Sequence, residues 1–180
     1  FSGGDPLMAD DAALTEAMQD LAALPQIQRL RIHTRLPVVI PDRVTQEFVG
    51  AVANIPVPVI VVLHINHAQE IDQAVVDAVS QLRQVCRSVL NQSVILAGVN
   101  DSSAAQIALS ETLYASGIDP YYLNVLDQVA GAAHLFVEAS KIRKIQHEML
   151  DALPGFLVPR LVREIAGVGH KVPWTETLDA

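Results

Sequence analysis

Polar residues that could bind ligands or move protons follow several short apolar runs in this sequence. Four such groups are Ser2-Gly3-Gly4-Asp5, His33-Thr34-Arg35, His64-Ile65-Asn66-His67, and Asn124 with Asp127. A further pair, Asn91-Gln92, lies inside an apolar run. A glycine pair lets the backbone approach a ligand closely, and imidazoles and carboxylates transfer protons or bind metal ions. Because working residues gather at the carboxyl ends of strands in parallel α/β proteins, the pattern predicts one shared site.

The histidines allow a metal-binding interpretation. His64 and His67, joined by His33 and Asp127, could form the centre of a metal-dependent hydrolase or lyase barrel. Their spacing matches no recognised zinc signature, and histidines at a strand end also hydrogen-bond to the backbone without any metal. Both interpretations stay open at this point.

Lys171 is one of only three lysines and follows Gly167-Val168-Gly169-His170. A lysine on such a glycine-containing loop is either an exposed tail residue or the amine that forms a Schiff base with an aldehyde. The residues alone do not separate these two roles.

Strands and helices are expected to alternate along the chain. Apolar, β-branched runs predict strands at residues 30–33, 57–63, 88–96 and 118–126. Helical spacing predicts helices at residues 11–24, 43–53, 69–86, 102–116 and 138–152. Strands recurring about every 30 residues with helices between them indicate a parallel sheet. A (β/α) barrel, or a piece of one, is the economical fold, with a doubly wound open sheet as the competitor.

Composition limits the class of protein. The 180 residues carry 12 Lys and Arg against 20 Asp and Glu, a formal charge of −8, which argues against a nucleic-acid partner. No apolar run approaches the roughly 20 residues needed to span a membrane, so we expect a soluble, cytoplasmic protein. The one cysteine, Cys86, excludes a disulfide scaffold and is interpreted as a small core residue.

The motifs together resemble the lysine 2,3-aminomutase family of radical S-adenosylmethionine enzymes. The matching stretches are 1–7, 29–37, 64–67, 91–94, 98–101, 120–122, 127, 131–134, 155–161 and 163–165, ending at Lys171. The order is that of the family over essentially the whole chain. The resemblance implies a (β/α)6-type radical barrel that converts L-α-lysine to β-lysine, an isomerase reaction.

The resemblance also implies roles for single residues. Ser2, Gly3, Gly4 and Asp5 look like the glycine motif that receives the amino-acid end of S-adenosylmethionine, and His64 and Gln92 resemble residues lining the same site. Asp127 matches the carboxylate that holds the side-chain ammonium of lysine. Glu164 stands where longer members of the family have an aspartate beside the substrate amine. Lys171 matches the lysine that binds pyridoxal 5′-phosphate.

Parts of the family pattern are missing. The three cysteines that hold the [4Fe–4S] cluster are absent, and the chain starts on Phe1, at what resembles the end of a strand. We therefore expect a C-terminal fragment, with residues 1–153 as part of the barrel and residues 154–180 as the segment carrying the cofactor lysine. The fragment alone is predicted to be inactive and prone to self-association. The resemblance is closest to the short branch that supplies β-lysine for elongation factor P. A non-catalytic remnant of a split gene is the remaining alternative.

Overall fold

The fold is built on one curved sheet of six strands. The computed structural model describes residues 1–127 and 131–174. The strands are β1 (Leu30–Thr34), β2 (Val59–Leu63), β3 (Ser88–Val94), β4 (Asp119–Asn124), β5 (Arg160–Arg163) and β6 (Val172–Pro173). Their order in the sheet is their order in the sequence; β1 to β5 are parallel, and β6 runs antiparallel to β5.

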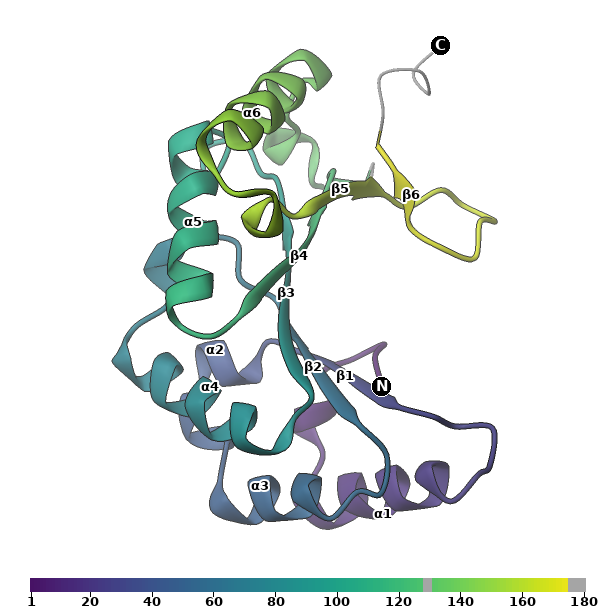
Figure 1. Cartoon of the computed structure of the whole chain (residues 1–180). Coiled ribbons are helices and arrows are strands. Elements are labelled where there is room, and N and C mark those ends of the chain that lie inside the picture. Colours follow the sequence, from purple (N-terminus) through teal and green to yellow (C-terminus); the bar gives the residue numbers. More distant parts are fainter. Residues whose placement is uncertain (128–130, 175–180) are drawn as a thin grey trace.

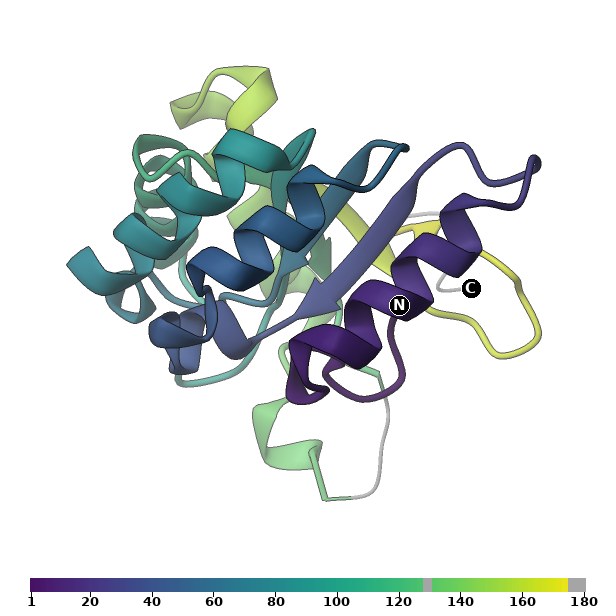
Figure 2. The ribbon, with the colours of Figure 1, turned by 90° about the horizontal axis from the view of Figure 1, so that it is seen from below.

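Helices connect the parallel strands. They are α1 (Asp11–Ala22), α2 (Leu36–Val39), α3 (Gln46–Ala53), α4 (Gln73–Val85), α5 (Ser103–Ala115) and α6 (Ala139–Ala152). Short 3₁₀ turns lie at Pro6–Met8, Pro41–Arg43, Ala68–Glu70, Ala133–Leu135 and Gly155–Leu157. The helices all cover the convex face of the sheet (Figures 1 and 2), whereas the loop before β6 and the N-terminal segment lie on the other side.

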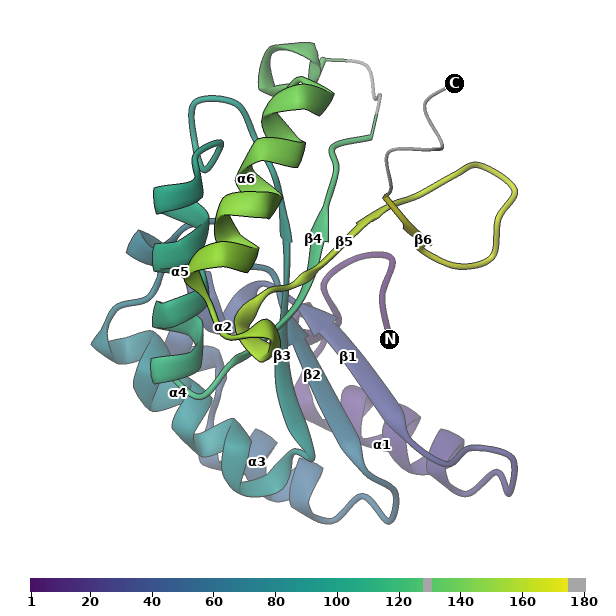
Figure 3. The ribbon, with the colours of Figure 1, turned by 45° about the horizontal axis from the view of Figure 1, so that its top comes forward.

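This winding distinguishes a barrel from a doubly wound sheet. A doubly wound sheet reverses its strand order and carries helices on both faces. Here the described strands follow one another without reversal, and the sheet curls towards its bare face (Figure 3). The expected fold class, a partial α/β barrel, is therefore confirmed, and the open-sheet alternative is wrong.

Two apolar clusters hold the helices against the sheet. The first packs β1 and β2 on α1, α3 and α4 around Ile32, Val61 and Phe48. The second packs β4 and β5 on α6, and it includes Met149 and Trp174. Because neighbouring residues of a strand face opposite sides, burial of Leu30, Ile32 and Thr34 turns Arg31 and His33 towards the concave face.

Side-chain caps set most of the helix starts. Asp10, Thr45, Asp72 and Ser102 each accept a hydrogen bond from a backbone N–H in the first turn of α1, α3, α4 and α5, respectively. The caps explain why the helices predicted from residues 43 and 69 begin later, at Gln46 and Gln73. Gly117 follows α5 at φ +79°, a backbone conformation that favours glycine.

The sequence prediction missed short elements. The single-turn α2 and the strands β5 and β6 were not expected, and β5 has only four residues, too few for a clear pattern. β2 begins at Val59 because the preceding proline has no N–H to donate to the ladder. Within the described residues, no helix is long and apolar enough to cross a membrane.

Candidate functional site

The first cavity, of about 560 Å³, opens on the concave face, at the carboxyl ends of β1, β2 and β3. Its lining residues are Ser2, Gly3, Gly4, Asp5, Arg31, His33, Thr34, Arg35, His64, Gln92, Glu164 and Lys171. A second, adjoining cavity has a volume of about 700 Å³. It shares with the first cavity the residues Arg31, His33, Gln92, Glu164 and Lys171, and it is also lined by Tyr121, Tyr122 and the loop 165–170. Of the nine residues to which the family resemblance gives a role, all except Asp127 thus line one cavity.

The N-terminal turn is fixed by the carboxylate of Asp5. Its oxygens accept hydrogen bonds from Thr34 Oγ1 at 2.6 Å and from the backbone N–H groups of Arg35 and Leu36 at 2.7 and 3.3 Å. It also accepts from the Leu7 N–H at 3.0 Å. Partial burial raises the pKa of this carboxyl, but the four hydrogen bonds outweigh burial and leave the pKa below its usual value. Asp5 therefore ties the turn to the end of β1.

The two glycines before Asp5 expose their backbone. Gly3 has φ +92°, which few side chains tolerate, and an added Cβ at either Gly3 or Gly4 would meet nothing within 4 Å. Backbone conformation, rather than crowding, selects glycine at position 3. The open space beside both residues leaves their peptide groups accessible to a ligand.

His64 and Gln92 form a polar pair at the ends of β2 and β3. A hydrogen bond of 2.7 Å joins Gln92 Nε2 and His64 Nε2. Burial lowers the pKa of His64, and the Asp5 carboxylate opposes this while Arg35 and Lys171 reinforce it. The segment after His64 is held by Asn91, which is 2% exposed and bonds both the N–H and the C=O of Ile65.

Lys171 reaches the cavity from the loop between β5 and β6. Its Nζ donates to Asn124 Oδ1 and to Glu164 Oε1, both at 2.7 Å. The Asn124 amide is oriented by a second bond, from its Nδ2 to the carbonyl of Ser93 at 2.9 Å. The ammonium also lies 5.9 Å from the centre of the Tyr122 ring. An amine held inside a cavity fits the Schiff-base interpretation better than an exposed tail.

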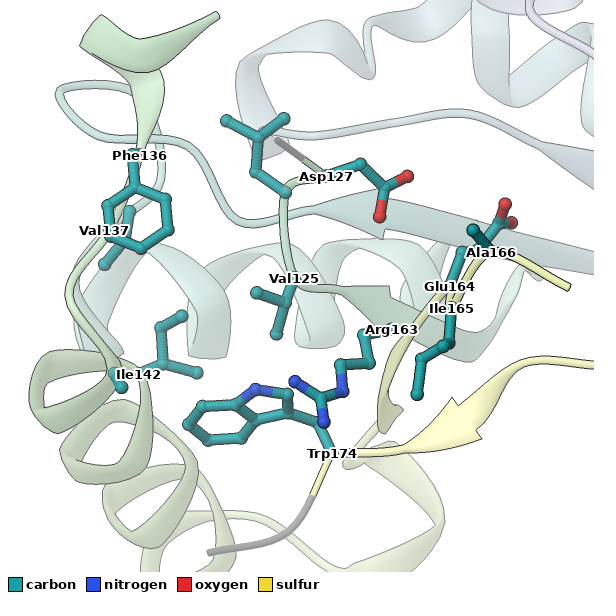
Figure 4. Close-up of a pocket in the computed structure, with 12 residues that line it drawn as sticks. Val125, Asp127, Phe136, Val137, Ile142, Arg163, Glu164, Ile165, Ala166 and Trp174 are labelled. Carbon is teal, nitrogen blue, oxygen red and sulfur yellow. The ribbon is translucent and has the colours of Figure 1, made fainter. Parts of the chain in front are cut away.

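Asp127 lines a third cavity, of about 800 Å³, between β4, β5 and α6. Figure 4 shows this cavity, with the Asp127 and Glu164 carboxylates at its upper edge and Trp174 and Arg163 below them. Glu164 lines both this cavity and the one that holds Lys171. The cavity of Asp127 also shares Ile165 and Ala166 with the 700 Å³ cavity, so residues 164–166 form a wall between Asp127 and the remaining site residues.

The four residues of the metal alternative are not brought together. His33 and His64 line the first cavity, Asp127 lines the third, and His67 caps the turn Ala68–Glu70 by accepting from the Gln69 N–H. No group of three or more His, Cys, Asp or Glu side chains in residues 1–127 and 131–174 is arranged to hold a metal ion. Neither finding favours a metal-dependent hydrolase or lyase.

Some residues of the site had no assigned role in the sequence prediction. Asn124, which contacts Lys171, was named only among the polar strand-end groups, Arg31 was given no role, and His33 was considered only as a metal ligand. The alternation of β1 places Arg31 and His33 on one face, which the sequence did signal. Cys86 packs against the first apolar cluster, and burial raises the pKa of its thiol to about 12, as expected for an inert core cysteine.

The fold is that of a partial α/β barrel, with parallel strands inside and helices on the outer face. The crystal structure of Streptococcus suis SuiB bound to S-adenosylmethionine superposes with a TM-score of 0.60, covering 91% of this chain and 38% of that protein, at 14% identity. At that identity the likeness concerns the fold alone. No model of a known protein family matches the sequence.

Sequence relatives make the assignment specific. The chain is 48% identical to the L-lysine 2,3-aminomutase of Escherichia coli and 47% to that of Haemophilus influenzae, over 96% and 98% of its residues. The protein of the same name from Buchnera aphidicola is 41% identical over 96%. The chain spans about half the length of these curated relatives: 51%, 52% and 51%. These matches confirm the resemblance to the lysine 2,3-aminomutase family over nearly all residues of this chain.

Proposed function

We propose that the chain is the C-terminal part of a lysine 2,3-aminomutase, an isomerase that converts L-α-lysine to β-lysine. The observation that carries the proposal is the convergence of the Gly3-Gly4 turn, the His64–Gln92 pair and Lys171 in one cavity. These three features lie far apart in the sequence. They are the ones that the family resemblance assigns to the binding of two cofactors.

The part of the first cavity beside the Gly3-Gly4 turn suits S-adenosylmethionine. The accessible peptide groups of Gly3 and Gly4, with Ser2 beside them, would bind the amino-acid end of the ligand. Asp5 would support this turn rather than touch the ligand, because its carboxylate already accepts four hydrogen bonds. His64 and Gln92 would line the nucleoside part.

The residues around Lys171 fit pyridoxal phosphate. The Lys171 side chain is 23% exposed and borders the 560 and 700 Å³ cavities. Tyr122 supplies a ring in the larger of the two, and Arg31, which lines both, supplies a positive charge for the phosphate. When bound to this amine, pyridoxal phosphate supplies the conjugated ring that makes migration of an amino group feasible. Asn124 and Glu164 would hold the ε-amine until the aldehyde replaces them.

An iron–sulfur cluster does not fit the residues present. The chain has one cysteine, and Cys86 packs against a core cluster at the end of α4. Three thiolate ligands must then come from outside these 180 residues. The backbone of Phe1 pairs with Arg31 and His33 in the parallel pattern, which supports the proposal that a further strand of the longer protein lies beside β1.

Lysine is the proposed substrate, held by Asp127 with help from Glu164. Both carboxylates edge the third cavity, whose wall is otherwise largely apolar and suits the methylene chain of lysine (Figure 4). A charge-assisted hydrogen bond to the far ammonium would fix which carbon faces the reacting centre.

We further propose membership of the short branch of the family. Identity is 41–48% to relatives of which the chain covers about half, and 32–34% to longer ones of which it covers 36–42%. The family resemblance assigns this branch to β-lysine supply for elongation factor P, which would place the protein in the cytoplasm.

The test is an anaerobic assay of the longer protein that contains these residues and a three-cysteine loop. With dithionite, S-adenosylmethionine, pyridoxal phosphate and lysine, we expect β-lysine, detected by chromatography. The same mixture with the 180-residue chain alone should give none. Absence of product from cluster-loaded protein that carries both cofactors would contradict the proposed function, and product from the chain alone would contradict the proposed fragment.

A further inference from the structure

The imidazole of His33 lies in the wall between the first and second cavities and has no assigned role. It lines both cavities, is half-buried, and makes an edge-to-face contact with His64 at a ring-centre distance of 6.1 Å. Within residues 1–127 and 131–174, neither ring nitrogen has a hydrogen-bond partner. A polar ring in this place is available to a ligand.

Most charged groups of the first cavity form ion pairs or hydrogen bonds with other protein groups. Arg35 pairs with Glu70 at 2.8 Å, Lys171 with Glu164 at 2.7 Å, and Asp5 with four donors. Arg31 precedes His33 by two residues on β1, so it lies deeper in the barrel and borders the second cavity as well. Between the glycine turn and Lys171, the cavity is lined by the side chains of His33, His64 and Gln92, with Arg31 beside them.

We propose that the uncharged imidazole of His33 contacts the sulfonium nucleoside bound beside the glycine turn and makes this cavity tolerate the positive charge of that ligand. The inference rests on the proposed function, because it takes S-adenosylmethionine as the ligand. It adds a specificity residue on β1, next to the His64–Gln92 pair.

The electrostatic surroundings of His33 agree with this role. Burial lowers its pKa to about 4, helped by the positive charges of Arg31 and Lys171. The ring thus stays neutral at physiological pH. A fixed positive charge in its place would repel a sulfonium ion bound in the same cavity, because water screens partly buried charges less than exposed ones.

The experiment compares two ligands that differ in charge. The holoenzyme, prepared anaerobically, is titrated calorimetrically with S-adenosylmethionine and with S-adenosylhomocysteine, which lacks the sulfonium charge. His33→Lys should weaken binding of the sulfonium ligand about tenfold or more and of the neutral one less than about threefold. His33→Gln should leave both affinities within about threefold. Gln19→Lys, which adds a charge on the exposed face of α1, is the matched control and should change neither.

The outcomes separate this inference from the proposed function. If wild-type protein binds neither ligand, the proposed function fails and the inference with it. If wild-type protein binds both and His33→Lys weakens them equally or not at all, only the inference is overturned. Should His33→Lys not fold, the test passes to the ring signals of His33 in the NMR spectrum of wild-type protein. A shift on adding S-adenosylmethionine that exceeds that of exposed His147 supports the contact, and its absence overturns it.

Discussion

The amine of Lys171 donates a 2.7 Å hydrogen bond to the carboxylate of Glu164, seven residues earlier in the chain. The Glu164 side chain is 63% exposed, so this ion pair is solvated and contributes little stability. A weak pair suits an amine that must leave its partner to react with an aldehyde. Asn124 supplies a neutral second acceptor, so the amine stays in the cavity without being bound strongly.

Lys171 should be the residue that binds pyridoxal phosphate covalently. Borohydride reduction of protein incubated with the cofactor should place the label on the peptide containing Lys171, found by mass spectrometry. Lys171→Arg should abolish the label, because a guanidinium does not form the Schiff base. Lys144→Arg, at an exposed position of α6, is the control and should retain it. A labelled peptide elsewhere, or none, would contradict the assignment.

Asp127→Asn should weaken lysine binding while leaving cofactor attachment unchanged. The substitution removes a charge from the edge of the third cavity but keeps the size of the side chain. A hydrogen bond to a charged group contributes about 1.5–3 kcal/mol, so the affinity for lysine should fall roughly tenfold or more. Calorimetry or the dependence of rate on lysine concentration measures it. Asp151→Asn, exposed at the end of α6, should have no effect; an equal loss in both variants would exclude a specific role for Asp127.

Asp5→Asn should destabilise the fold. An amide cannot accept all the hydrogen bonds that the carboxylate takes from Leu7, Thr34, Arg35 and Leu36. The expected loss is about 1–3 kcal/mol in the free energy of unfolding, measured in urea. Asp10→Asn is the control, because asparagine caps a helix as well as aspartate does.

The same carboxyl makes stability depend on pH. The folded-state pKa of Asp5 lies below its usual 3.8, so the native state binds fewer protons than the unfolded state in this range. Its contribution is complete above the unfolded pKa and is lost as the pH falls through the folded one. The difference in unfolding free energy between wild type and Asp5→Asn should therefore shrink in acid; a constant difference would contradict this.

Asn91→Ala should disturb the segment after His64. The substitution leaves the buried N–H and C=O of Ile65 without partners, at a cost of about 1–3 kcal/mol for each group. We expect a loss of about 2–5 kcal/mol in urea unfolding and a moved His64 ring signal in NMR spectra. Asn54→Ala removes one exposed hydrogen bond at the end of α3 and should cost well under 1 kcal/mol. Similar losses in the two variants would contradict the role of Asn91.

His33 should titrate near pH 4 in the folded protein. Burial and the positive charges of Arg31 and Lys171 disfavour its protonated form. Since the usual pKa is 6.5, the unfolded state binds more protons between pH 6.5 and about 4, and stability should fall as the pH falls through this window. NMR titration of the ring protons measures the pKa, with His33→Gln to assign the signal. A titration midpoint above 6.5 would contradict the neutral ring.

The sequence by itself determined the alternation of strands and helices and most of their positions. Buried valine and isoleucine runs such as Val59–Leu63 and the capping residues Asp10 and Ser102 act locally, through backbone hydrogen bonds a few residues away. The strand-end rule also selected polar groups that line one cavity, because a parallel sheet brings all its carboxyl ends to one edge. The family resemblance added the roles proposed for those groups.

Only the tertiary structure decided how these groups are shared among cavities. Asp127 and Lys171 line different cavities, and the His33 ring packs edge-to-face against His64. Such relations depend on the register and curvature of the sheet. These bring together pairs of residues that are separated by 31 to 47 positions in the sequence. The four-residue strand β5 is too short to show a pattern, and it forms because β4 offers an edge with which it can pair. Non-local pairing, which no local pattern encodes, set the geometry of the site.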